Sequence, residues 1–276
     1  MLRNDRAACV VQRDRLLEEA NRVLSETKNE VDPYGRGTAG SVLPPEGASI
    51  RVCVYRAYPD GRDLATPQDI IERLDQYKVL ANSGQVSLPA LNKFGLDSFA
   101  RGARSNRTNR NEQDPELPIT TVIHSGGVFV SMARLPFRQE EHHLAESGKQ
   151  AVQCVLAESV CSLAMALLRC AFRWFQAFGC YAALHANVSF SAQSERGHYI
   201  VTNSVELRGR HTAVFGPASP HLTADFTPPW PAASECDRIS EDATRRYISS
   251  FNVRDSHVAK AIIERAKELV VTRFDD

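Results

Sequence analysis

The stretch that decides the fold runs from Gln150 to Leu184 and reads QAVQCVLAESVCSLAMALLRCAFRWFQAFGCYAAL. It is the longest run of periodic apolar residues in the chain. On a helix of about 100° per residue, its polar side chains fall on one narrow stripe. The stripe consists of Glu158, Ser162, Arg169, Arg173 and Gln176. A helix with so little polar surface is predicted to be enclosed by protein, and Gly179 is predicted to end it or kink it.

A membrane-spanning helix is the alternative interpretation of this stretch. Such a helix needs about 20 predominantly apolar residues with few or no charges. Arg169, Arg173 and Gln176 interrupt the run, and each arginine costs about 2.5–3.5 kcal/mol at the centre of a bilayer. We therefore predict a buried core helix in a protein that does not enter the membrane.

The two arginines of the stripe, Arg169 and Arg173, are four residues apart. Like charges at this spacing on a helix repel each other mildly. The favoured interpretation is that solvent or distant acids neutralise them, since exposed charges contribute little. The alternative is that Arg169 and Arg173 face an anion or a protein partner.

The composition is that of an ordinary soluble globular protein. Of 276 residues, 43% are hydrophobic, and 33 Lys and Arg balance 33 Asp and Glu, so no global basic field indicates a nucleic-acid binder. The opening MLRNDRAACV contains no apolar stretch typical of a signal peptide. The seven cysteines form no C-x-x-C pair. Buried reduced thiols fit best, which predicts a cytoplasmic protein.

The amino-terminal residues 5–31 are predicted to form an amphipathic helix. Val10, Leu17, Leu24 and Val31 recur every seven residues. The Gly- and Pro-rich residues 33–48 are predicted to be a linker, which divides the chain into a helix (1–32), the linker and one domain (49–276). The helix either packs on its own domain or binds a protein partner or a second copy as a homo-dimer.

A local run of arginines is the one charge anomaly. Arg101, Arg104, Arg107 and Arg110 recur every third residue in a segment, 98–114, predicted to be a flexible loop. No acid occurs from Ser98 to Asn111. The alternative is that the four arginines contact phosphate groups of a nucleic acid.

The remaining patterns predict the fold class. Alternating residues indicate a strand at 50–55, a β-hairpin at 119–134 and strands at 186–192 and 198–207. Helices are predicted at 66–80, with Thr66 as its N-cap, and at 256–271. A further strand is predicted at 212–215 and a Pro-rich loop at 216–236. The order of hairpin, long buried helix and hairpin predicts an α+β protein. We expect a mostly antiparallel sheet with flanking helices at both ends.

Few motifs with chemical meaning occur. G-x-S-x-G, H-E-x-x-H and G-x-G-x-x-G are absent, and the eight histidines are dispersed. His142 and His143 are adjacent, so on a helix they would point in different directions, unlike a zinc pair. Residues 140–149 are interpreted as the approach to the central helix. No catalytic residue, metal ligand or cofactor is predicted.

Several segments resemble a known family. They are TPQDIIERLD (66–75), FGLDSFARGAR (94–104), GGVFVSMARLP (126–136) and HANVSF (185–190). Together they resemble the accessory region that follows the core of some bacterial Schlafen-like (AlbA-type) putative DNA- or ATP-binding proteins. The resemblance covers roughly residues 50–215. It does not include the core domain of that family, so it implies no role for a particular residue.

Three hypotheses about function follow. The leading one is a non-catalytic cytoplasmic accessory or sensing module that acts through a protein partner. The second is a nucleic-acid-binding protein that uses the Arg-rich segment. The third is an enzyme whose site assembles in space beside the central helix.

Overall fold

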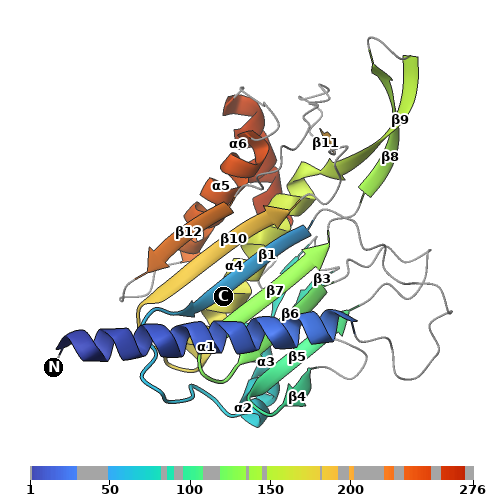
Figure 1. Cartoon of the computed structure of the whole chain (residues 1–276). Helices are drawn as coiled ribbons and strands as arrows, with labels where there is room; N and C mark the ends of the chain where they lie inside the picture. Colours follow the sequence, from blue (N-terminus) through green and yellow to red (C-terminus); the bar gives the residue numbers. More distant parts are fainter. Residues whose placement is uncertain are drawn as a thin grey trace, which may run out of the picture.

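The computed structural model describes residues 2–29, 49–81, 86–89, 96–107, 119–134, 137–144, 148–180, 182–191, 199–201, 221–226, 233–249 and 256–270. The chain folds as an α+β protein around a largely antiparallel sheet, as the sequence predicts. Helices lie on both faces of this sheet (Figure 1).

The main sheet has seven strands in the order β12-β10-β1-β7-β6-β5-β4. Their bounds are β1 (Ser49–Arg56), β4 (Asp97–Phe99), β5 (Gly102–Arg107), β6 (Ile119–His124), β7 (Val128–Arg134), β10 (Leu184–Ser191) and β12 (His221–Phe226). Strand β1 lies in the middle, where Ile50 pairs with Phe190 of β10 and with Ala133 of β7. The predicted hairpin at 119–134 is confirmed as β6 and β7.

The predicted core helix is confirmed as α4 (Ala157–Ala177), and most of its residues are buried. It packs on one face of the sheet together with α5 (Ala233–Ser249) and α6 (Ser256–Glu268) (Figure 1). Gly179 follows the helix at a φ of +59°, and the Cys180 N–H donates to the Phe175 carbonyl at 3.0 Å. Glycine adopts this left-handed conformation without steric cost, so the predicted stop at Gly179 is confirmed. Among the described residues, no helix is long and apolar enough to cross a bilayer.

The prediction for residues 140–156 was wrong. Residues 150–156 belong to strand β9 (Gly148–Leu156), which pairs with β8 (Phe137–Leu144) instead of opening the central helix. Strand β11 (Tyr199–Val201) adds to β9 in parallel, which completes a three-stranded sheet. Val152 and Val155 are β-branched residues that favour strands, and the pairing of Phe137 with Val155 satisfies backbone groups that a helix would satisfy locally.

The first helix, α1 (Leu2–Asn29), crosses the face of the sheet opposite α4 (Figure 1). Four of its hydrophobic residues are buried against that face: Leu16, Ala20, Val23 and Leu24. They pack on Cys53 of β1, Val122 of β6, and Val128 and Val130 of β7. Val10, the first member of the predicted seven-residue repeat, is 38% exposed. Val31 lies outside the described residues.

A short helical segment follows β1. Helix α2 (Pro67–Glu72) begins at Thr66, whose hydroxyl accepts from the Asp69 N–H at 3.1 Å. Asp69 in turn accepts from the Thr66 N–H, so the predicted cap is confirmed as a reciprocal capping box. The predicted helix at 66–80 is divided into α2 and α3 (Leu74–Tyr77). Its last residues enter strand β2 (Val79–Ala81), which pairs with β3 (Val86–Leu88).

Two segments predicted as loops contain regular structure. The Arg-rich segment 98–114 begins with the β4–β5 hairpin, in which Asp97 pairs with Arg104. The Pro-rich segment 216–236 contains β12 and the first residues of α5. Residues 108–118 and 202–220, including the predicted strand at 212–215, lie outside the described residues.

Candidate functional site

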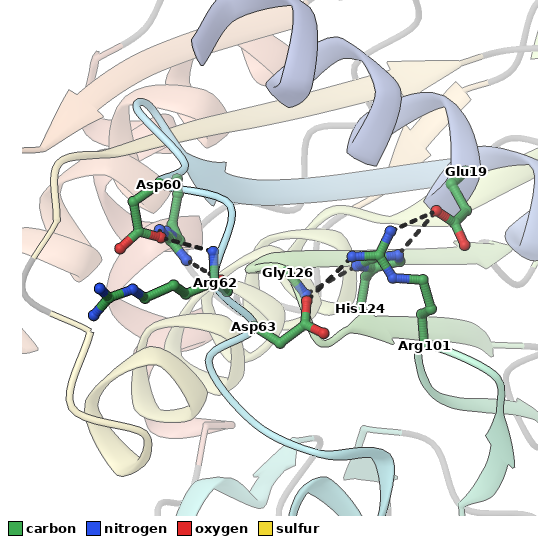
Figure 2. A network of polar contacts seen from close by, with 8 residues as sticks. Glu19, Asp60, Arg62, Asp63, Arg101, His124 and Gly126 are labelled. Carbon is green, nitrogen blue, oxygen red and sulfur yellow. Dashed lines mark hydrogen bonds and ion pairs between the residues drawn. The ribbon is translucent and has the colours of Figure 1, made fainter. Parts of the chain in front are cut away.

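A polar cluster joins α1 to the β6–β7 turn (Figure 2). We call it the His124 cluster and define it by Glu19 of α1, Asp63 before α2, Arg101 of the β4–β5 turn, and His124 and Gly126 of the β6–β7 turn. These residues come from four separate parts of the sequence. Ion pairs and close contacts among Glu19, Asp63, Arg101 and His124 join these parts.

The turn that carries His124 depends on two glycines. Gly127 has a φ of +92°, which favours glycine. A Cβ atom on Gly126 would lie 2.7 Å from Cδ2 of Leu16 and 3.2 Å from Nδ1 of His124. The Ser125-Gly126-Gly127 sequence therefore serves both the tight turn and the close approach of α1.

The two ring nitrogens of His124 differ: Nδ1 has a hydrogen bond, whereas buried Nε2 lies near a carboxylate without a hydrogen bond of good geometry. Nδ1 accepts from the Gly126 N–H at 3.0 Å, so Nε2 carries the proton of the neutral ring. Nε2 lies 3.3 Å from Oε2 of Glu19. The side chain is 0% exposed. Burial lowers the pKa of His124, and the Glu19 carboxylate only partly offsets that effect.

One arginine links the two acids of the cluster. Arg101 lies with Nη1 3.4 Å from Oε2 of Glu19 and Nη2 3.2 Å from Oδ1 of Asp63. Two acids thus surround one guanidinium beside a neutral imidazole. Arg101 and Asp63 are about half exposed, so these pairs fix the position of α1 more than they stabilise the fold.

A second ion pair holds the segment beside the cluster. Arg56, which is 4% exposed, donates to the Arg62 carbonyl at 2.9 Å and pairs with Asp60. The hydrogen bond from Arg56 lowers the pKa of Asp60. Leu64 also donates its N–H to the Ser125 carbonyl at 2.7 Å. The segment between β1 and α2 is therefore attached to the same turn that contacts α1.

The arrangement is suited to positioning and not to proton transfer. A general base needs a ring nitrogen that can receive a proton from a substrate, and the Gly126 N–H occupies that nitrogen of His124. Among the described residues, no group of three His, Cys, Asp or Glu side chains is arranged to hold a metal ion. The His124 cluster anchors α1 to the sheet.

The structure separates the four predicted phosphate-binding arginines. Arg101 belongs to the His124 cluster, and half-buried Arg104 donates to the Thr27 hydroxyl of α1 at 3.4 Å. Arg107 ends β5 opposite Ile119. Arg110 lies outside the described residues. Nucleic-acid binding by these residues stays a prediction, and the contacts described for Arg101 and Arg104 are made within the chain.

The polar stripe of α4 divides along its length. Glu158 and Ser162 are buried, Arg169 and Arg173 are half-buried, and Gln176 is exposed. Arg169 and Arg173 lie on α4, on the opposite side of the sheet from α1. The structure therefore does not bring these two arginines together with the His124 cluster. A partner that faces them, and an enzyme site beside α4, both stay predictions.

Sequence reasoning did not identify the other members of the cluster. His124 directly precedes the Ser-Gly-Gly turn, which is the one local signal. Glu19 and Asp63 are ordinary surface acids in the sequence, and only the packing of α1 brings them to Arg101.

Comparisons with known proteins place no relative beside this chain. It matches no protein-family model, no curated protein and no solved structure. The resemblance to the accessory region of Schlafen-like proteins therefore stays a prediction.

Proposed function

We propose that this chain is a protein-interaction module in which α1 is the partner-binding element. The observation that supports the proposal is the exposure of Val10 (38%) and Val11 (61%) on α1. Together with Tyr58 they are the large hydrophobic residues exposed in the described part of the chain. In Figure 1 the amino-terminal end of α1 extends past the strands that its carboxyl-terminal half covers.

The exposed part of α1 has the features of a helix that binds in a groove. Ala7 and Val11 are four residues apart, and Ala8 and Val11 are three apart, so they form neighbouring anchors on the helix surface. Ala7 and Ala8 are exposed as well. Fully burying a valine side chain contributes about 1.5–3 kcal/mol, so a partner gains from covering them.

The charges around these anchors indicate the chemistry of the partner. Arg6 and Arg15 are exposed, whereas Arg13 lies 2.9 Å from the Asp14 carboxylate. Residues 6–15 thus carry a net positive charge. A protein with an apolar groove and an acidic rim complements this surface.

Site-specific photo-crosslinking tests the proposal. A photoreactive amino acid is placed at Val11 or, as a control, at Ser25, which is also exposed on α1, in cells that make the protein. We expect a discrete crosslinked product from position 11 and none from position 25. A product of twice the chain mass indicates a homo-dimer in place of a different partner. Equal products from both positions, or none from either, would contradict the proposal.

A matched pair of substitutions provides a second test. Val11→Asp and Ser25→Asp each add one negative charge to an exposed position of α1. We expect Val11→Asp to abolish the crosslink made from a photoreactive residue at position 8, and Ser25→Asp to leave it unchanged. Circular dichroism checks that both variants keep the fold.

A further inference from the structure

We propose that His124 is a pH-sensitive anchor of α1, and that proton uptake by its ring shifts the chain toward a state in which α1 has left the sheet. The biological meaning of this anchor rests on the proposed function, in which α1 is the partner-binding element. The docking of α1 is nevertheless a property of the chain alone and is measured without a partner.

The first step of the argument is that α1 itself buries His124. The ring ends β6 on the face of the sheet that α1 covers, where the preceding inward residue, Val122, packs with Leu16 and Ala20 of the helix. Glu19 lies against Nε2 of the ring. Departure of α1 therefore removes the carboxylate and the apolar cover and admits water to His124.

The second step is that the docked state has no place for a second proton. A proton on Nδ1 would face the Gly126 N–H, which donates to that atom at 3.0 Å. The turn would lose this hydrogen bond, and the charged ring would be buried. A buried donor that faces another donor is strongly disfavoured.

The third step concerns every charged group that faces the ring. Glu19 from α1 and Asp63 from the segment before α2 attract the added proton, whereas Arg101 from the β4–β5 turn repels it. The Phe99 ring of β4 lies with its centroid 6.2 Å from the imidazole centroid and adds no charge. Burial is the largest influence, and the net result is that the pKa of His124 falls below 6.5 in the docked state.

The sign of the pH effect follows from these steps. A histidine exposed to water titrates near its ordinary pKa of about 6.5. At pH values between the pKa of His124 in the docked state and its higher pKa in the undocked state, the undocked state binds more protons. A fall in pH therefore favours undocking. Between pH 7.5 and 5.5 the undocking constant rises by up to about tenfold, which is the limit for one proton in this window. Ordinary carboxyl groups titrate below the window, near pH 4.

Hydrogen exchange of the full chain measures this equilibrium. Exchange is followed by mass spectrometry at pH 7.5 and 5.5, with times corrected for the intrinsic pH dependence of amide exchange. We expect peptides from residues 13–27 to lose protection at pH 5.5 by up to about tenfold. Peptides from α4 should stay unchanged. Equal protection of α1 at both pH values would overturn the proposal.

The matched variant is His124→Asn. Its side-chain oxygen takes the position of Nδ1 and accepts from the Gly126 N–H, but asparagine does not titrate. We expect the pH dependence of α1 protection to disappear in this variant. The same pH dependence as in the wild type would also overturn the proposal.

An NMR titration of the wild-type protein tests the same proposal if the His124→Asn variant does not fold. We expect the His124 ring to titrate below pH 6.5, and the amide signals of α1 to change in the same range. A pKa of 6.5 or above overturns the proposal. These measurements are made on the chain without a partner. A negative result here would therefore not affect the crosslinking result, and the absence of a crosslink would not affect the pH dependence of α1.

Discussion

A Cβ atom on Gly126 would lie 2.7 Å from Cδ2 of Leu16, a distance that real side chains do not adopt. Helix α1 is thus in direct contact with the backbone of the β6–β7 turn. The need for glycine at this position arises from that contact, because a positive φ occurs at the next residue, Gly127, and not at Gly126.

The first prediction concerns this contact. Gly126→Ala should displace Leu16 and lower the free energy of unfolding by about 1–3 kcal/mol, the usual cost of overpacking. Urea denaturation followed by circular dichroism measures the change. The amides of α1 should lose protection from hydrogen exchange more than those of α4.

A double-mutant cycle identifies the cause. Leu16→Ala removes the atoms that the new methyl group meets, so Gly126→Ala should cost less in that background. If Gly126→Ala costs as much in the Leu16→Ala background as in the wild type, the contact is not the reason for its effect.

The second prediction concerns the core around α4. Leu167 is 0% exposed within the main hydrophobic cluster. Leu167→Ala should lower the free energy of unfolding by about 2–5 kcal/mol, because it removes buried methyl groups and leaves a cavity. Gln176→Ala, at an exposed position of the same helix, is the control and should stay within about 0.5 kcal/mol. Equal effects in urea denaturation would contradict the burial of α4.

The third prediction concerns the ion pair of Arg56 and Asp60. The Arg56 guanidinium is only 4% exposed. Asp60→Asn removes the carboxylate that pairs with it and leaves the Arg62 carbonyl as its hydrogen-bond acceptor. The variant should lose about 1–2 kcal/mol of stability at pH 7. This is less than the roughly 3–5 kcal/mol of a fully buried pair, since the Asp60 side chain is 59% exposed.

The same pair predicts a pH dependence. The pKa of Asp60 is lowered from 3.8, so its contribution is present above pH 3.8 and is lost as the pH falls through the lower, folded-state value. The stability difference between wild type and Asp60→Asn should therefore narrow between pH 6 and pH 3. Asp75→Asn, at an exposed site of α3, is the control. A difference that stays constant over this range would exclude the ion pair as its source.

The fourth prediction concerns Cys53, which lies under α1. Burial raises its pKa from 9.0 to about 11, so at pH 8 its thiolate fraction is about one hundredth of the ordinary value. Iodoacetamide should alkylate Cys53 at least about a hundredfold more slowly in the native protein than in urea. Peptide mapping by mass spectrometry measures the rate. Equal rates in both conditions would show that α1 does not cover this residue.

The features predicted well from sequence are those with strong local periodicity. The 3.6-residue pattern of α4 expresses its burial directly, and the Ser-Gly-Gly turn between two runs of strand-forming residues marks the β6–β7 hairpin, so these elements are present as predicted. Burial itself does not alternate along β6, because the sheet is covered on both faces there. The Thr66 cap and the Gly179 stop are also local, since each depends on a few neighbouring residues.

The features predicted poorly depend on partners distant in the sequence. Residues 150–156 are apolar enough to extend a helix, but residues 150–155 pair with residues 137–142 and form a strand. Helix α5 was not predicted, although Ile239, Ala243 and Tyr247 recur every four residues and are buried. The polar residues among them concealed the pattern.

The candidate site could not have been predicted as a whole. Arg101 was predicted to contact phosphate because other arginines lie close to it in the sequence. Its contacts in the structure are with Glu19 and Asp63. A charged residue in the sequence does not reveal which acid it will meet. That information comes from the packing of α1 across β1, β5, β6 and β7. The only local signal for this packing in α1 is the spacing of its apolar residues between Leu16 and Leu24.

The central position of β1 has a consequence for how the chain folds. Residue 49 pairs with residue 134 on one side and with residue 191 on the other. During synthesis, β1 and α1 emerge long before either neighbouring strand or the surface that α1 covers. The β5–β6–β7 meander can close through nearby contacts, whereas the amino-terminal third must wait for loop closures over long separations. We therefore expect slow folding in which α1 is among the last elements to become fixed.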